Sequence, residues 1–182
     1  MVVSAVGTGV ALAYNDTGRN VCNWSYDDDT TLELPYRSDP QFPSTGAYAV
    51  AWSSARLNWN DADTPVEFTY DGGQQSHTLG ATEMGMSAAN GVLYDYCWNF
   101  GKRSATRGLL NESTLEDENA VFKRSTASHE LGHYIGLRHS TVTPSIMNHN
   151  GNFYTYGIQQ QDDECGVQDI YPHEDYPLEC DY

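Results

Sequence analysis

The chain has 182 residues, of which 39% are hydrophobic, so it is long enough for one domain with a substantial core and is not a disordered chain. Its formal net charge is −16 with only 9 lysines and arginines, which argues against nucleic acid and anionic membranes as partners. Adaptation to salt or to a calcium-rich medium is one interpretation of this charge. A soluble secreted surface without a specific acidic partner is the interpretation we prefer.

Residues 1–13 are apolar and small after the initial methionine. They end in Ala11-Leu12-Ala13, an A-x-A pattern of the kind that signal peptidases cut. The basic n-region is missing, so we interpret the segment as the end of a signal peptide that starts upstream; an ordinary first strand is the alternative. Residues 14–182 are expected to form one domain, because no repeat or linker divides them. No stretch approaches the roughly 20 apolar residues of a transmembrane helix.

Four cysteines, Cys22, Cys97, Cys165 and Cys180, form no C-x-x-C pair. An even count in an exported chain predicts two disulfides. Three pairings exist, and we favour Cys22 with Cys97 and Cys165 with Cys180. Four reduced, buried thiols in a cytosolic protein are the alternative.

Residues 14–30 are polar and rich in turn-forming residues, and we expect a loop. The three aspartates at 27–29 could ligate calcium, but the spaced ligands of an EF-hand loop are absent. A solvated acidic turn is the favoured interpretation, and calcium binding has no support in the sequence.

A strand, a helix and a second strand are predicted next, over residues 31–36, 47–59 and 64–70. Residues 60–63 end the helix, and the turn at 71–73 ends the second strand. This order predicts a right-handed crossover in a parallel sheet. The apolar or aromatic positions of the helix are Tyr48, Val50, Ala51, Trp52, Ala55, Leu57 and Trp59.

The middle of the chain, residues 74–107, gives a weaker pattern. Residues 92–100 and 106–111 are predicted strands. His77 stands alone in the sequence, so we expect it to be a surface residue.

Residues 114–117 fit the capping-box pattern, with Asp117 in place of the usual Glu or Gln. We therefore expect a helix from about Asp117 or Asn119 to about Gly136. Its buried side is expected to include Val121, Phe122, Thr126, Ala127 and Leu131. A last helix should begin at Asp162 or Asp163 and end before Pro172, followed by a tail that Cys180 holds.

The helix contains the sequence H-E-x-x-H-x-x-G-x-x-H at residues 129–139. Residues four apart share one helix face, so His129 and His133 can point at one metal ion, and Glu130 can reach a water beside it. Gly136 can end the helix because glycine adopts a left-handed conformation, and the chain can then return His139 as a third ligand. Three neutral imidazoles with an open fourth position are typical of a catalytic zinc site.

A methionine, Met147, lies in the segment 145–148, shortly after the third histidine. The motif with a downstream methionine resembles the metzincin metalloproteases, in which a Met-turn lies beneath the zinc. Ser140, directly after His139, and residues 161–171 resemble the matrixin branch. The resemblance implies an α+β fold: one catalytic domain with a twisted, mostly parallel sheet, an active-site helix and a C-terminal helix.

The resemblance and the motif imply a secreted zinc endopeptidase with Glu130 as general base, acting on proteins or peptides, and we expect a monomer. Matrixins often hold a second, structural zinc in the middle of the domain with several histidines and an aspartate. Residues 74–107 contain no such cluster, so we predict one zinc. Residues 1–30 contain no P-R-C-G-type segment of the kind that keeps matrixins latent; either a pro-segment lies outside this sequence or latency is managed otherwise.

Two other functions remain compatible with a three-histidine zinc site. A non-catalytic zinc domain for binding is disfavoured because Glu130 is intact, and a site without activity needs no base. A zinc hydrolase acting on a non-peptide amide or ester is not excluded by the motif.

His149 lies two residues after Met147, where astacins and serralysins have a tyrosine that reaches the zinc or the oxyanion and matrixins have a proline. An imidazole could donate the same hydrogen bond. A solvated loop histidine is the favoured alternative, because Asn148, Asn150 and Gly151 suit a turn.

Overall fold

The structure is a computed structural model that describes residues 22, 24–26, 31–97, 102–148, 156–176 and 180. Its elements in chain order are β1 (Leu32–Ser38), α1 (Gly46–Asn60), β2 (Val66–Tyr70), β3 (His77–Thr82), β4 (Gly91–Cys97), β5 (Arg103–Asn111), α2 (Glu112–Leu115), α3 (Ala120–Ile135) and α4 (Gln161–Ile170).

The five strands form one sheet in the order β2-β1-β3-β5-β4. Neighbouring strands run parallel except for β4, which pairs antiparallel with β5 at one edge. The chain leaves β1, passes through α1 and returns as β2 beside β1, as the strand–helix–strand pattern predicts. The α+β fold with a mostly parallel sheet is therefore confirmed.

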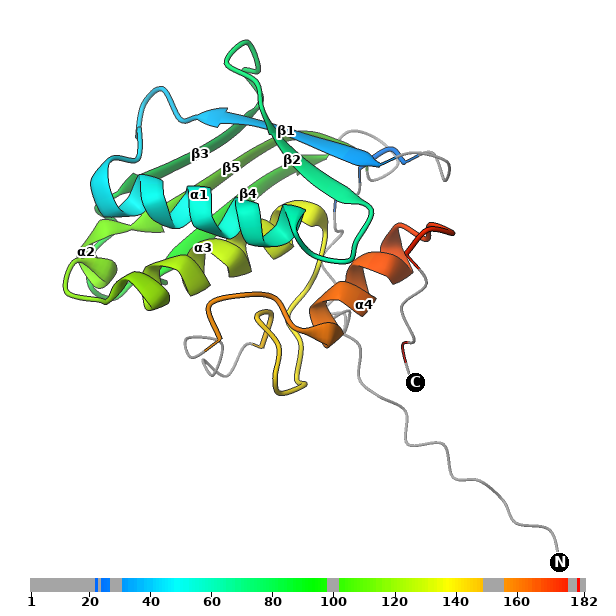
Figure 1. The fold of residues 1–182 in the computed structure, drawn as a ribbon. Helices are drawn as coiled ribbons and strands as arrows, with labels where there is room; N and C mark the ends of the chain where they lie inside the picture. Colours follow the sequence, from blue (N-terminus) through cyan, green and yellow to red (C-terminus); the bar gives the residue numbers. More distant parts are fainter. Residues whose placement is uncertain are drawn as a thin grey trace, which may run out of the picture.

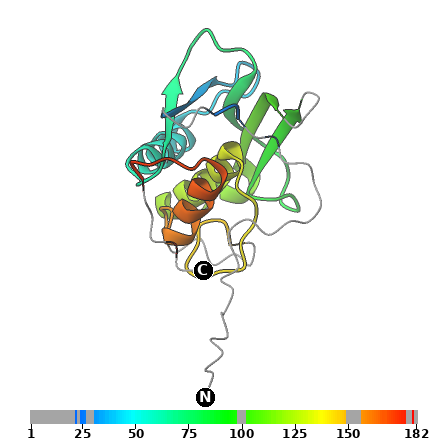
Figure 2. The same cartoon turned by 90° about the vertical axis from the view of Figure 1, so that its right-hand side faces the viewer.

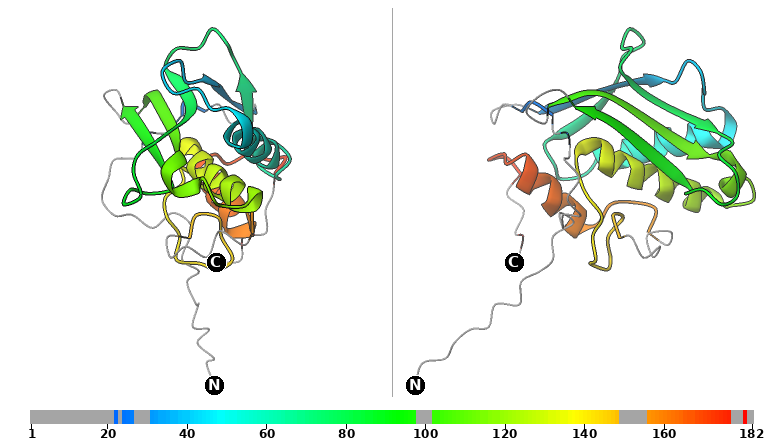
Figure 3. Two further views of the ribbon diagram at one scale, coloured as in Figure 1. Left: turned by 90° about the vertical axis from the view of Figure 1, so that its left-hand side faces the viewer. Right: turned by 180° about the vertical axis from the view of Figure 1, so that it is seen from behind.

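Helices α1 and α3 lie side by side under one face of the sheet (Figures 1 and 3). The turned view in Figure 2 shows the same layering, with α4 on the side of α3 that faces away from the sheet. Helix α3 thus packs against α1 and against the strands β4 and β5, and α4 lies beyond it. No helix among the described residues combines the length and apolar character that crossing a membrane requires.

Helix α1 ties the sheet to α3 through two tryptophans. Trp52 donates from Nε1 to Gly80 O on β3 at 2.9 Å, and Trp59 donates to Ser128 O on α3 at 3.0 Å. Both indoles are buried and satisfy their polar N–H, as a buried tryptophan requires. Two apolar positions of the predicted helix do not face the core: Val50 is 61% exposed and Leu57 is 47% exposed.

Strand β3 is absent from the sequence-based prediction. It lies between β1 and β5, and its first five residues are buried, so its side chains do not alternate between polar and apolar. The prediction that His77 is a surface residue is wrong. His77 opens β3, is only 6% exposed, and lies against Trp24 with ring centroids 4.7 Å apart.

Helix α3 begins after Asn119, whose side chain accepts from Phe122 N at 3.0 Å, and ends at Gly136, within the predicted bounds. The predicted capping box at 114–117 is wrong. Thr114 lies in the short helix α2, whose first turn is capped by Asn111 accepting from Ser113 N. Most of the predicted buried side of α3 faces the core, but Val121 is 42% exposed.

The remaining elements follow the prediction closely. Strand β4 ends at Cys97, and β5 begins three residues earlier than expected, at Arg103. Helix α4 ends at Ile170, before Pro172. The disulfides pair Cys22 with Cys97 and Cys165 with Cys180, as favoured, so the second bridge holds the tail against α4.

Candidate metal centre

Three histidines converge at the C-terminal end of α3. His129 and His133 lie one turn apart on the helix, and His139 returns to them after the chain has turned. Each offers one ring nitrogen, and these three atoms all lie within 4.8 Å of one another. Among the residues the structure describes, this is the group of potential metal ligands that comes together, and it is the group the sequence predicts.

The turn that returns His139 depends on Gly136. Its φ is 131°, a conformation that side chains other than hydrogen rarely allow. The amides of Gly136 and Leu137 both donate to Gly132 O, at 3.1 and 2.9 Å, and so close the helix. His129 is buried, His133 half-buried and His139 exposed, so one side of the centre is open to solvent.

Backbone carbonyls fix the orientation of two imidazoles. His129 Nδ1 lies 2.8 Å from Ile146 O, and His133 Nδ1 lies 2.8 Å from Leu137 O. A carbonyl can only accept a hydrogen bond, so each Nδ1 carries the proton and each Nε2 presents a lone pair. This is the outer support that metal-ligating histidines generally have.

The donor set fits zinc. His133 Nε2 and His139 Nε2 face each other at 3.2 Å. Ligands held tetrahedrally at about 2.0–2.1 Å from a zinc ion stand about 3.3 Å apart. A cation placed between these lone pairs would relieve their mutual repulsion, and three nitrogens leave a fourth position on the solvent side.

Burial favours the neutral, ligating form of the histidines. It lowers the pKa of His129 well below the ordinary value, with a further contribution from His133. It also lowers the pKa of His133 to about 4. Neutral imidazoles at pH 7 are ready to accept a metal without releasing protons.

Glu130 lies beside the histidines, and its carboxyl group reaches the edge strand. It is 5% exposed, and burial raises the pKa of its carboxyl group to about 8. The carboxyl group packs against Gly91 of β4, where a Cβ would stand 2.7 Å from Oε1. The sequence pattern around residue 91 did not reveal this contact, because it joins two elements far apart in the chain.

Met147 packs directly beneath the helix, as the resemblance implies. Its side chain is fully buried, and a Cβ at Gly132 would overlap its Sδ atom. The Met-turn therefore approaches α3 at its only glycine, which lies between the two helical histidines and directly precedes His133.

Asp163 of α4 anchors the Met-turn and is a residue that the sequence analysis treated only as a helix start. Its carboxylate accepts from Ser145 Oγ at 2.6 Å, from Ile146 N at 2.7 Å and from Met147 N at 3.1 Å. Because Ile146 O in turn orients His129, Asp163 holds the support of that ligand. Burial raises the pKa of Asp163 to about 6, while these hydrogen bonds lower it.

His149 lies outside the described residues, so its predicted role at the metal stays a prediction. The same holds for the signal-peptide interpretation of residues 1–13 and for the acidic turn at 27–29.

Comparison with known proteins places the chain in a family. No curated protein matches it significantly. The matrixin family model matches residues 23–172, which include all nine helices and strands described above. Matrixins are zinc metallopeptidases, and the three-histidine centre on α3 agrees with that chemistry. The chain therefore belongs to the matrixin family.

Proposed function

We propose that the protein is a secreted zinc endopeptidase, with one zinc held by His129, His133 and His139. The observation that carries the proposal is the convergence of three ring nitrogens within 4.8 Å, two of them on imidazoles oriented by carbonyls. His139 is exposed, so one side of the centre is open to solvent, where water and substrate could reach a bound metal.

Zinc bound there would supply Lewis acidity, polarising a substrate carbonyl and making water acidic enough to react at neutral pH. Burial alone raises the pKa of the Glu130 carboxyl group to about 8, but the positive charge of a zinc ion beside it would favour the ionised form. As a carboxylate, Glu130 then takes the proton from the attacking water. It returns that proton to the nitrogen of the leaving amine, as a general base that becomes a general acid. Its buried setting beside Gly91 keeps the carboxylate in one place for both transfers.

Proteins or peptides are the proposed substrates, as expected for the matrixin family. The two disulfides suit an oxidising compartment, which supports export, with residues 14–182 as the mature domain and residues 1–13 as the end of a signal peptide. A monomer without nucleic-acid or membrane partners remains our expectation, given the net charge of −16.

Metal content tests the ligand set. Purified wild-type protein should carry one zinc per chain by elemental analysis, and His139→Ala should lose most of it. His173→Ala, which changes a histidine beyond α4, is the matched control and should keep full zinc. Two tightly held zincs in the wild type, or full zinc in His139→Ala, would contradict the assignment.

The role of Glu130 is tested by activity at constant metal content. Glu130→Ala and Glu130→Gln should both keep zinc, because the carboxylate is not proposed as a ligand. Casein cleavage should fall by roughly 10²-fold or more, the usual contribution of a general base. Near-normal proteolysis by either variant would remove Glu130 from the mechanism.

A further inference from the structure

The last turn of α3 needs partners for its carbonyl groups. A helix leaves its final carbonyls without donors from the helix itself. Here Gly132 O is satisfied by the turn at Gly136, and the carbonyls of His133, Tyr134 and Ile135 follow it. Each of these three accepts from a side chain of another segment. Tyr171 Oη donates to Ile135 O at 2.7 Å, and Trp24 Nε1 donates to Tyr134 O at 2.9 Å.

Arg103, at the start of β5, supplies the remaining donors. Its Nη2 donates to His133 O at 3.2 Å and its Nη1 donates to Tyr134 O. Nη2 also donates to Cys22 O at 2.8 Å, so one guanidinium joins the helix end to the amino-terminal segment. These contacts come from Nη1 and Nη2, while the buried Nε has no partner among the described residues. The two terminal nitrogens of a planar guanidinium can reach several carbonyls at once, which the single nitrogen of a lysine cannot do in the same geometry.

The charge of Arg103 matches this position. Its side chain is fully buried, and Asp95 of β4 pairs with it at 2.8 Å. Asp95 is itself held by Thr106, which stands opposite it in the β4–β5 ladder. The cation faces the negative end of the α3 dipole, where positive charge is stabilising.

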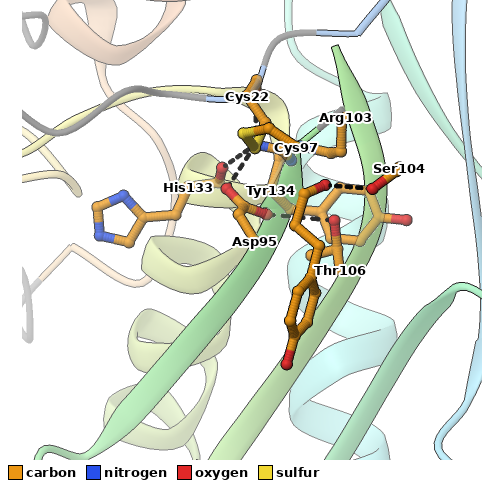
Figure 4. Close-up of a disulfide and its surroundings, with 9 residues drawn as sticks. Cys22, Asp95, Cys97, Arg103, Ser104, Thr106, His133 and Tyr134 are labelled. Atoms are coloured by element: carbon orange, nitrogen blue, oxygen red, sulfur yellow. Dashed lines mark hydrogen bonds and ion pairs between the residues drawn. A yellow bond between two sulfur atoms is a disulfide. The ribbon is translucent and has the colours of Figure 1, made fainter. Parts of the chain in front are cut away.

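The Cys22–Cys97 disulfide completes the arrangement. Cys97 pairs with Arg103 across the ladder, and its bridge to Cys22 places the Cys22 carbonyl beside the guanidinium. Figure 4 shows the disulfide, Arg103 and Asp95 gathered at the backbone of His133, while the imidazole of His133 points away from them. Arg103 therefore contacts the backbone of this residue and leaves its ring free.

We infer that Arg103 is a positioning residue for the metal centre: it fixes the last turn of α3, which carries His133 and from which the chain turns to His139. The inference rests on the proposed zinc binding at these histidines. His139 leaves the helix only after Gly136, so the direction of the last turn decides where its ring nitrogen stands. Buried ion pairs add little to stability on balance, but a guanidinium bonded to Asp95 and to three backbone carbonyls can hold the helix end in one arrangement.

The test compares arginines on one strand. Arg103→Met removes the guanidinium donors and the charge. Arg103→Lys keeps the positive charge but replaces the planar guanidinium by a single nitrogen. Arg107→Met is the matched control, because Arg107 also lies on β5 and pairs with a buried aspartate, Asp39, at 2.7 Å. For each zinc-loaded protein, zinc retention is measured against graded chelator, and the visible absorption spectrum is recorded after exchange into Co²⁺. Thermal unfolding gives the stability of each variant.

Zinc retention in Arg103→Met should weaken about 10-fold or more, the scale seen when outer support of a ligand is removed. The Co²⁺ spectrum of Arg103→Met should also differ from that of the wild type. Arg103→Lys should show a zinc retention between those of the wild type and Arg103→Met. Arg107→Met should lose thermal stability while its zinc retention and Co²⁺ spectrum stay as in the wild type.

A purely structural role for Arg103 would lower thermal stability with zinc retention and the Co²⁺ spectrum unchanged, and that result would overturn the inference. If Arg103→Met does not fold, unchanged retention and spectrum in Arg103→Lys decide against it in the same way. A wild-type protein that binds no zinc would instead refute the proposed function, so the two failures are distinguishable.

Discussion

Glu130 has room against the sheet because residue 91 is a glycine. A Cβ at Gly91 would stand 2.7 Å from Oε1 and 2.8 Å from Cγ of Glu130, closer than side chains approach in folded proteins. The edge strand thus limits where the proposed base can lie relative to the three histidines.

Gly91→Ala should therefore displace the carboxylate and lower kcat by about 10-fold or more, while zinc content stays at the wild-type level, because misplaced catalytic groups lose rate steeply. Steady-state kinetics with elemental analysis measures both. Gly108→Ala on β5 is the control: a Cβ there would stand 2.9 Å from Leu79 Cδ2, so it should lower stability and leave kcat alone. Equal kcat values for Gly91→Ala and the wild type would show that Glu130 needs no such space.

His77 should make the fold sensitive to acid. Burial, with a contribution from nearby Arg103, lowers the pKa of His77 to about 4, so the folded protein favours the neutral ring. The unfolded chain binds the proton near pH 6.5, and stability is therefore lost as pH falls from about 6.5 to about 4. His77→Phe keeps a ring beside Trp24 and should remove on the order of 1–2 kcal/mol of this pH dependence. Urea unfolding at pH 7 and at pH 4.5 gives the loss of unfolding free energy between the two pH values. An equal loss in His77→Phe and in the wild type would exclude His77 as the cause.

The two disulfides should differ in their contribution to stability. Cys22–Cys97 spans 75 residues and Cys165–Cys180 spans 15. Because longer closed loops restrict the unfolded chain more, replacing the first pair by serine should cost about 4 kcal/mol and the second about 3 kcal/mol. Chemical denaturation of the two double variants gives both values. A larger loss from Cys165→Ser with Cys180→Ser would contradict this order.

Asp163 should matter more than its neighbour Asp162. Asp163 accepts from Ser145 and from two backbone amides of the Met-turn, whereas Asp162 accepts from Ser140 Oγ at 2.9 Å. Asp163→Ala leaves buried donors without partners, which should cost about 1–3 kcal/mol, and it should weaken zinc retention by loosening the support of His129. Asp162→Ala is the control. Equal zinc retention in the two variants would show that the hydrogen bonds of Asp163 to the Met-turn do not support zinc binding.

The features that local sequence determines could be predicted. The helix that carries the histidines begins after Asn119 and ends before Gly136, because a capping side chain and a glycine act within one turn of the chain. The spacing of His129 and His133 puts them on one face for the same local reason. The disulfide pairing was a choice among three and is confirmed.

The features that depend on distant contacts could not be predicted. Strand β3 lacks alternation because both of its faces are covered, and the burial of His77 depends on Trp24 and Tyr134. Thr114 fits a capping pattern, but Asn111 and Asn119 supply the caps. Gly91 and Arg103 contact α3 only because the fold places β4 and β5 beside that helix. The sequence around each residue therefore does not indicate these contacts.

Cleavage of a peptide library by the purified protein tests the central claim most directly. The zinc-loaded protein should cleave internal peptide bonds, a chelator should abolish the cleavage, and added zinc should restore it. A protein that carries zinc on its three histidines but cleaves no peptide, or one whose cleavage persists after its zinc has been removed, would contradict the account.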